Sequence, residues 1–223
     1  MPHSSGGSGQ GVGKGQWVVG YYSEHVVPRI INVACGLKGT EASRTRVCAG
    51  LDGEVVELGF GSGHNVAFYP STVTRVAAIE PSDVGWNLGS KRIAASAVPV
   101  VRSGLDGQSL PFDDNHFDSA LSTWTLCTIP DGEAALKEVR RVLKPGGTLH
   151  FIEHGLAPDE SVQRWQHRLE PLQMRLFGGC HLTRPIAEML TDAGFVITEI
   201  DVFYEKGAPK LLAADSLGTA VSP

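Results

Sequence analysis

The 223-residue chain is 42% hydrophobic and 19% charged, which suits one globular domain that buries its core without disulfides or metals. The net charge is -5, and the lysines and arginines are scattered, so nothing indicates a nucleic-acid surface; no apolar run reaches the ~18 residues of a transmembrane helix. The four cysteines lack the spacing of zinc or redox motifs, so we expect a reduced, cytoplasmic protein with no metal site and no integral membrane anchor.

The N-terminal part of the chain divides into an arm and a helical cap. Residues 1–16 are rich in glycine and serine and lack an apolar segment, so we expect a flexible arm rather than a signal peptide. Residues 17–52 carry two or three expected helices, with a boundary or kink at Pro28 and a last helix between the N-cap Thr40 and Gly50. We assign this cap and a core over 53–223 to a single domain, 17–223.

Short runs rich in valine and isoleucine alternate with helical segments after Gly53. Such alternation predicts a largely parallel sheet with helices on both faces. Strands are expected over 54–59, 73–80, 98–102, 117–123 and 147–155, with helices over 64–70, 83–97 and 131–144 between them.

The C-terminal part is expected to add two helices and an edge strand. One helix covers 161–179 around Pro171, and the next follows Thr183 as its N-cap and ends at Gly194. In the last strand, Val196, Thr198, Ile200 and Val202 alternate with polar residues and are expected to face the core. Such alternation is typical of an antiparallel edge pair.

The stretch VVELGFGSG runs from a strand into Gly59, Gly61 and Gly63. A dinucleotide loop reads G-x-G-x-x-G, so the third glycine comes one residue early here. For the glycines alone, a tight strand-to-helix turn is the plain alternative. Glu57 at the strand end would repel a pyrophosphate, and it suits a cationic cofactor without phosphates, such as S-adenosylmethionine.

Two further acidic positions favour an adenosine compound. Glu80 ends the second strand, where a carboxylate can accept hydrogen bonds from both ribose hydroxyls, although dinucleotide enzymes share this feature. Asp106 and Gln108 lie on a loop at the carboxyl edge of the sheet, where Asp106 could accept from the adenine amino group.

Taken together, VVELGFGSG, IEPS, GQSLPFDDNHFD and EVRRVLKPGGTL resemble the class I S-adenosylmethionine-dependent methyltransferases (type 11 group) in order and spacing. The segments YYSEHVVPRIIN and LFGGCHLTR resemble the branch that holds bacterial small-molecule and mammalian alkyl-thiol methyltransferases. The resemblance implies a Rossmann-like, doubly wound α/β fold: a seven-stranded, mostly parallel sheet with an antiparallel last strand, under an N-terminal helical cap.

The resemblance also implies which residues hold the cofactor. The glycine loop would pass under the methionine part, Glu80 would bind the ribose, and the following residues would flank the adenine. Two departures are Phe60, where Cys is frequent, and Cys127-Thr128, where many relatives have two histidines; the second touches the acceptor pocket. The implied cofactor residues are Tyr22, Glu57, Gly59, Phe60, Gly61, Gly63, Glu80, Pro81, Ser82, Asp106, Gly107, Gln108, Ser122 and Thr123.

Methyl transfer from a sulfonium is an in-line displacement with a neutral leaving group. Positioning of the acceptor can therefore supply most of the catalysis, ~7–11 kcal/mol, and a base is needed only when the acceptor must lose a proton. His154 and His181 are the candidate bases; the alternatives are a histidine held by a carbonyl and a loop-ordering residue.

Other polar and aromatic residues receive structural interpretations. We interpret Cys127 and Cys180 as buried small apolar groups and Glu170 as part of a solvated helix face. The aromatic residues could wall an apolar acceptor pocket, with core packing as the alternative for each. They are Trp17, Tyr21, Tyr22, Trp124, Trp165 and Phe177.

We therefore expect methyl transfer from S-adenosylmethionine, with S-adenosylhomocysteine as product, to the thiol or hydroxyl of a small apolar or aromatic molecule. Lipid or quinone methylation is the alternative within the class. A nicotinamide-dependent oxidoreductase and a non-catalytic cofactor-binding protein are the alternatives outside it. The expected partner is the small-molecule acceptor.

Overall fold

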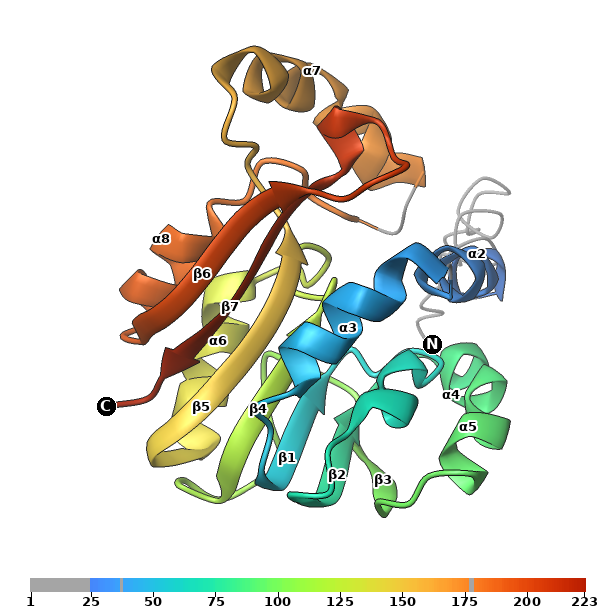
Figure 1. Ribbon diagram of the computed structural model, residues 1–223, viewed down its shortest axis with the longest axis vertical. Coiled ribbons are helices and arrows are strands. Elements are labelled where there is room, and N and C mark those ends of the chain that lie inside the picture. Colours follow the sequence, from blue (N-terminus) through green and yellow to red (C-terminus); the bar gives the residue numbers. More distant parts are fainter. Residues whose placement is uncertain (1–24, 37, 177–178) are drawn as a thin grey trace, which may run out of the picture.

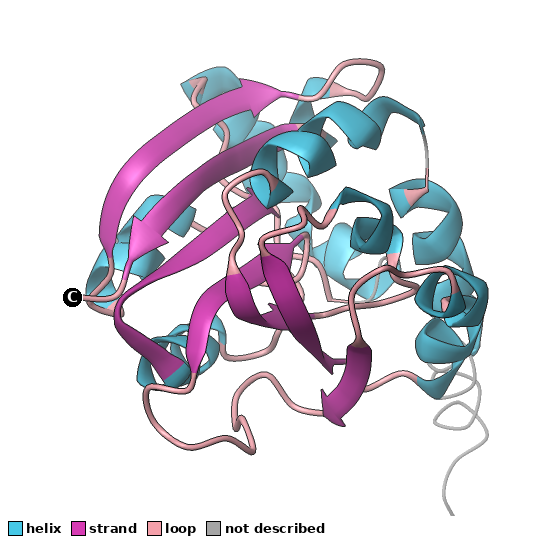
Figure 2. Ribbon diagram, turned by 60° about the horizontal axis from the view of Figure 1, so that its bottom comes forward, coloured by secondary structure: helices cyan, strands magenta, loops and turns pink. Residues whose placement is uncertain are grey.

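A seven-stranded sheet in the order β3-β2-β1-β4-β5-β7-β6 forms the centre of the computed structural model, which describes residues 25–36, 38–176 and 179–223. Helices cover both faces of this sheet (Figures 1 and 2). The strands are β1 (Gly53–Leu58), β2 (Val73–Ile79), β3 (Val100–Gly104), β4 (Phe117–Thr123), β5 (Leu143–His154), β6 (Val196–Tyr204) and β7 (Ala214–Val221).

All the neighbouring pairs from β3 to β5 are parallel, whereas β7 runs antiparallel to both β5 and β6. This arrangement confirms the predicted sheet. The order reverses between β1 and β4, and the connections leave toward opposite sides there. A crevice at the carboxyl ends of these strands is the expected ligand site of such a sheet.

The helices begin and end close to where the sequence signals predicted. Pro28 lies in the first turn of α2, as expected of a proline at a boundary, and residues 64–68 form a 3₁₀ helix rather than an α-helix. The helical elements are α2 (Val27–Cys35), η2 (Lys38–Thr40), α3 (Glu41–Cys48), η3 (His64–Phe68), α4 (Asp83–Leu88), α5 (Ser90–Ala94), α6 (Gly132–Val142), α7 (Glu160–Leu176), α8 (Ile186–Asp192) and η4 (Lys210–Leu212). None of the helices in the described ranges combines the length and apolar character needed to cross a membrane.

Apolar side chains form one core on each face of the sheet. On one face, Leu136 and Val139 of α6 and Leu190 of α8 pack against the strands. On the other face, Val47 of α3 and Val55 of β1 belong to a second cluster. The two clusters fix the sheet between its helical layers and hold its carboxyl edge in place.

The prediction that Val196, Ile200 and Val202 of β6 point into the core is wrong. Val196, Ile200 and Val202 are 56%, 37% and 42% exposed. A break in register between Ile197 and Glu199 moves the alternation, so that Ile197 packs against one core and Phe203 against the other.

The predicted cap of α8 is also wrong. Pro185 occupies the N-cap position, and the Thr183 hydroxyl donates instead to Glu170 on α7. The Thr183 hydroxyl therefore makes a tertiary hydrogen bond to Glu170 instead of capping the N-terminus of α8.

Candidate active site

A cavity of about 440 Å³ opens where β1, β2 and β4 end, at the point where the strand order reverses. Eight residues that the sequence predicted for the cofactor line it: Gly59, Gly61, Glu80, Pro81, Ser82, Asp106, Gly107 and Gln108. The predicted Tyr22 lies outside the described residues.

The cavity also has walls that the sequence analysis did not assign to the cofactor. Pro28, Ile31 and Asn32 come from α2, which carries a strong apolar periodicity and belongs to the predicted cap. The segment after β4 contributes the other wall, of which only Trp124 was among the aromatic candidates. This segment supplies Trp124, Thr125, Thr128, Ile129 and Pro130.

Gly59 and Gly61 of the glycine loop have different structural roles. Gly59 and Gly61 have φ of 61° and 59°, in the left-handed region. A Cβ on Gly59 would lie 2.1 Å from Thr125 Oγ1, so the fold itself requires this glycine. A Cβ on Gly61 would meet only the Gly59 carbonyl oxygen, at 3.8 Å, so the space over Gly61 belongs to the cavity.

The carboxylate of Glu80 holds this loop from the tip of β2. Glu80 is 5% exposed; Oε2 accepts from the Gly61 N–H at 2.6 Å, and Oε1 accepts from the Ser82 N–H at 2.7 Å. Burial raises the pKa of Glu80, against the opposing effect of these bonds and of the Arg102 charge. A carboxylate has about four acceptor sites, so two backbone bonds leave room for hydroxyl donors in the cavity.

The loop after β3 carries the predicted adenine contacts. Asp106 Oδ1 accepts from the main-chain N–H and the side-chain amide of Gln108, at 2.8 and 3.1 Å. Gln108 Oε1 in turn accepts from the Asp131 N–H at 2.9 Å, at the start of α6. These bonds leave Asp106 Oδ2 available to a ligand amino group.

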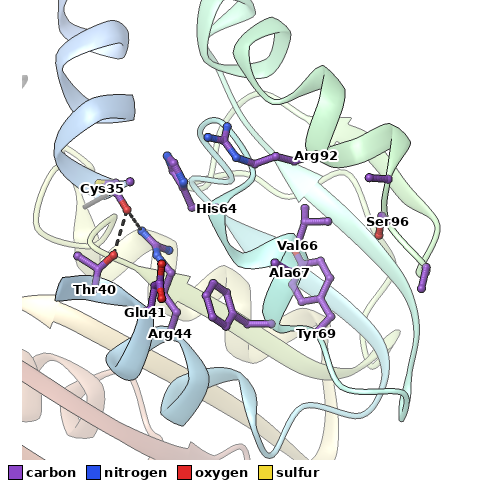
Figure 3. A pocket seen from close by; sticks show the side chains of 14 residues that line it. Cys35, Thr40, Glu41, Arg44, His64, Val66, Ala67, Tyr69, Arg92 and Ser96 are labelled. Atoms are coloured by element: carbon purple, nitrogen blue, oxygen red, sulfur yellow. Dashed lines mark hydrogen bonds between the residues drawn. The ribbon is translucent and has the colours of Figure 1, made fainter. Parts of the chain in front are cut away.

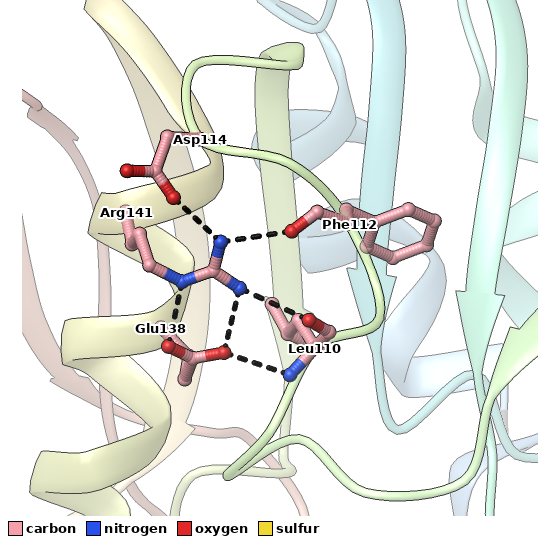
Figure 4. A network of polar contacts seen from close by, with 5 residues as sticks. All are labelled: Leu110, Phe112, Asp114, Glu138 and Arg141. Carbon is pink, nitrogen blue, oxygen red and sulfur yellow. Dashed lines mark hydrogen bonds and ion pairs between the residues drawn. The ribbon is translucent and has the colours of Figure 1, made fainter.

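Arg141 on α6 anchors the far end of the same loop (Figure 4). Its guanidinium donates to Glu138, to Asp114 and to the main-chain carbonyls of Leu110 and Phe112. Glu138 also accepts from the Leu110 N–H at 2.8 Å. The loop that carries Asp106 is therefore bonded to α6 at two points, at the start of the helix through Gln108 and at Arg141 through Leu110 and Phe112.

Glu57 lies behind the glycine loop and does not line the cavity. It is 1% exposed, and its two oxygens accept from Asn65 Nδ2 at 2.8 Å and from the Tyr69 hydroxyl. Burial raises the pKa of Glu57 to about 7, against the opposing effect of the Tyr69 and Asn65 bonds and of the Arg44 charge. Glu57 therefore organises the residues under the loop.

Four more of the predicted cofactor residues also lie behind the cavity wall. Ser122 donates to Glu153 at 2.6 Å, and Thr123 Oγ1 accepts from Asn65 at 3.0 Å. Phe60 and Gly63 pack on each other, because a Cβ on Gly63 would approach the Phe60 ring to 2.9 Å. None of these four residues lines the cavity, and their described contacts are with other residues of the protein.

His154 pairs with a buried carboxylate beside the cavity. Its Nδ1 lies 2.7 Å from Asp215 Oδ1, which also accepts from Trp124 Nε1 at 3.1 Å. Burial alone would lower the pKa of His154, but the bond and charge of Asp215 outweigh it and the pKa is raised. The His154 and Trp124 ring centroids are 6.2 Å apart, which places the imidazole behind a residue of the cavity wall.

His181 is held differently, by Glu170. His181 Nδ1 lies 2.8 Å from Glu170 Oε1, and Thr183 also donates to this carboxylate. The interpretation of Glu170 as a solvated residue is therefore wrong: its side chain is 16% exposed and joins α7 to the segment before α8.

The aromatic and cysteine interpretations have mixed outcomes. Trp165 is 55% exposed, so core packing is wrong for it, and it is not among the described residues that line the cavity, whereas Trp124 is. Trp17, Tyr21 and Phe177 lie outside the described residues. Cys127 and Cys180 are free and buried, as expected of small apolar groups.

The charges of the cavity wall suit a cationic adenosine compound. Among the described lining residues, Glu80 and Asp106 are charged and no lysine or arginine is present. A pyrophosphate would meet carboxylates without a compensating cation, whereas a sulfonium and an ammonium would meet favourable charge. The open space over Gly61 gives room for such a molecule against the main chain.

Comparisons with known proteins agree with this geometry. A family model described as a methyltransferase domain matches residues 56–151. The chain is 32% identical over 167 residues to the rat thiol S-methyltransferase TMT1B, an alignment that covers 71% of this chain and 67% of the relative. It is also 32% identical over 122 residues to the demethylmenaquinone methyltransferase of Clavibacter sepedonicus, covering 54% of this chain and 49% of the relative.

The fold has matching solved structures as well. One is a SAM-dependent methyltransferase from Aquifex aeolicus, which superimposes with a TM-score of 0.62 at 16% sequence identity and covers 88% of this chain and 98% of that one. The chain spans about two thirds of the length of the rat thiol S-methyltransferase. With the cavity at the strand-order reversal, these likenesses lead to one conclusion: the chain belongs to the class I S-adenosylmethionine-dependent methyltransferases.

Proposed function

We propose that the chain transfers the methyl group of S-adenosylmethionine to a small apolar molecule, with a thiol sulfur as the favoured acceptor and a hydroxyl oxygen as the next. One observation carries this proposal: apart from the two carboxylates expected at the adenosine, the described residues of the cavity wall are apolar or uncharged. Its apolar residues are Pro28, Ile31, Ile79, Pro81, Leu105, Trp124, Ile129 and Pro130. The likeness to thiol S-methyltransferases supports the choice of a thiol.

In this proposal, the residues around the cavity hold and orient the cofactor, which supplies the methyl group on a positively charged sulfur. Glu80 accepts from the ribose hydroxyls, in charge-assisted hydrogen bonds. Asp106 accepts from the adenine amino group, and the main chain at Gly61 lies against the cofactor. Because the leaving group is neutral, no acid is needed on the cofactor side.

The acceptor side provides positioning and one base. Trp124 is a fixed part of the wall: its ring lies 4.8 Å from the Arg44 guanidinium, and its indole N–H is held by Asp215. We propose His154 as the base: its ring lies behind Trp124 rather than in the described cavity lining, but its side chain is 30% exposed, and Asp215 would stabilise the imidazolium that forms when it takes the proton of a thiol or hydroxyl. His181, which is tied to Glu170, orders the segment before α8.

A matched acceptor panel tests the proposal. The protein is incubated with S-adenosylmethionine and 1-octanethiol, 1-octanol, thiophenol, phenol or a demethylmenaquinol, and the methylated product and S-adenosylhomocysteine are quantified by mass spectrometry. We expect the thiols to be methylated fastest, with one S-adenosylhomocysteine per methyl sulfide. Turnover of the quinol alone would support the lipid and quinone alternative and contradict the thiol assignment.

A pair of histidine variants tests the assignment of the base. We expect His154→Gln to lower kcat with 1-octanol more than with 1-octanethiol, because the alcohol loses its proton less readily. His167→Gln, at an exposed position of α7, is the matched control and should retain activity. Equal rates for the two variants on both acceptors would remove His154 from the reaction.

A further inference from the structure

A second cavity, of about 540 Å³, lies on the α3 face of the sheet and shares no described lining residue with the cofactor cavity. α3, η3 and α5 enclose it, together with the end of α2 (Figure 3). Its walls combine small apolar surfaces with polar groups that the proposed methyl transfer does not use. The apolar part consists of Val66, Ala67, Phe68, Ala95 and Ala97.

Arg44 brings a buried positive charge into this cavity. It is 4% exposed, donates to Asn65 Oδ1 at 2.5 Å and to the Cys35 carbonyl at 3.0 Å, and leaves Nε without a partner. No carboxylate of the described chain lies within ion-pair distance of it; Glu57, whose charge also acts on it, is bonded to Asn65 and Tyr69. A buried guanidinium of this kind is costly unless an anion accompanies it.

A second arginine and a neutral histidine face the same space (Figure 3). Arg92 donates to the Ser62 carbonyl at 3.0 Å and forms no ion pair with the described residues. His64 Nε2 lies 3.0 Å from the Asn32 carbonyl oxygen. Burial, followed by the charges of Arg92 and Arg44, lowers the pKa of His64 to about 4, so His64 is neutral at pH 7.

The net charge of the cavity lining indicates the charge that a ligand should carry. Cys35 and Tyr69 are neutral at pH 7, because burial raises the pKa of each. Glu41 contributes one negative charge against the two arginines. The described lining thus carries a net charge of about +1, which is balanced by a monoanion rather than a dianion.

We propose that this cavity binds a small monocarboxylate with an apolar body, whose carboxylate lies between Arg44 and Arg92 and whose body packs on Val66, Phe68 and Ala95. Guanidinium groups match carboxylates in geometry and charge. The volume falls within the ~300–1,000 Å³ of small-molecule sites. This site is separate from the proposed methyl transfer and does not depend on it.

An NMR titration of His64 tests the proposal on the full-length protein, with S-adenosylhomocysteine present throughout to fill the cofactor cavity. The probe is hexanoate; 1-hexanol supplies the same apolar body without the charge. His64→Gln assigns the resonance. At pH 7, where the carboxylate is ionised and His64 is neutral, we expect hexanoate to shift the ring resonances of His64 saturably and 1-hexanol to cause no saturable shift.

Variants locate the site. We expect Arg92→Gln to weaken hexanoate binding about tenfold or more by calorimetry, because a charge-assisted bond is lost. Arg75→Gln, at an exposed arginine of β2, is the matched control and should bind like the wild type. The absence of a saturable His64 shift with hexanoate, equal affinities of the two variants, or an equal response to inorganic phosphate would each overturn the proposal.

Discussion

The open space over Gly61 allows the cofactor position to be tested with a single methyl group. Gly61→Ala places a Cβ 3.8 Å from the Gly59 carbonyl oxygen and in contact with no other described atom within 4 Å, so the protein itself accommodates it. The left-handed backbone, φ 59°, adds about 1–2 kcal/mol of strain. If the cofactor lies against this main chain, overpacking costs a further ~1–3 kcal/mol of binding, or about 5- to 150-fold in Kd.

Gly146→Ala is the matched control for the strain. Gly146 has φ 81° and no heavy atom within 4 Å of a built Cβ, and it does not line the cavity. Both variants should lose similar unfolding free energy in urea, whereas only Gly61→Ala should bind S-adenosylhomocysteine more weakly by calorimetry. Equal affinities for the two variants would refute the placement of the cofactor over the glycine loop.

Three further predictions concern the carboxylates around the site. Glu80→Gln should weaken S-adenosylhomocysteine binding by about 1.5–3 kcal/mol, roughly 10- to 150-fold by calorimetry, because a charged acceptor is lost; unchanged affinity would remove Glu80 from the ribose. Asp215→Asn should move the acidic limb of the pH–rate profile to lower pH, because Asp215 raises the pKa of His154 while burial lowers it; an unmoved limb would count against the pair. Glu138→Gln should cost about 1 kcal/mol of stability at pH 7 by urea unfolding, after allowance for partial exposure. Since Arg141 lowers the pKa of Glu138 from 4.5, this difference should be full above about pH 4.5 and vanish as the pH falls through the lowered value; a pH-independent difference would contradict the ion pair.

The part of the cavity lined by the glycine loop, Glu80 and Asp106 could be predicted from the sequence because its signals are local. Gly59 and Gly61 have positive φ directly after a buried strand, and Glu80 directly follows the next strand, which ends at Ile79. In a parallel sheet, the carboxyl ends of neighbouring strands meet at one edge, so these residues come together without further information. Asp106 reaches the same edge on the loop after β3.

The parts that escaped prediction depend on contacts between distant segments. Pro28 and Ile31 line the cavity because α2 packs over it. The sequence of α2 indicates an apolar face but does not indicate which part of the protein that face contacts. Thr183 reads as an N-cap in sequence, but Glu170 on another helix binds it. The face exposed by β6 depends on a break in register after Ile197, which no local alternation indicates.

The side of the cavity that we propose for the acceptor was the least predictable for the same reason. The pairing of His154 with Asp215 joins β5 to β7 across an antiparallel contact, 61 residues apart in sequence. The cation–π contact between Arg44 and Trp124 likewise joins the helical cap to the end of β4. Single residues of these pairs carry no signal that identifies the partner.

A crystal structure with S-adenosylhomocysteine tests the central claim most directly. The account predicts that both ribose hydroxyls lie within hydrogen-bond distance of Glu80, that the adenine lies against Asp106–Gln108, and that the sulfur faces the wall that contains Trp124 and Thr128. A ligand bound elsewhere, or a ribose that makes no contact with Glu80, would contradict the account.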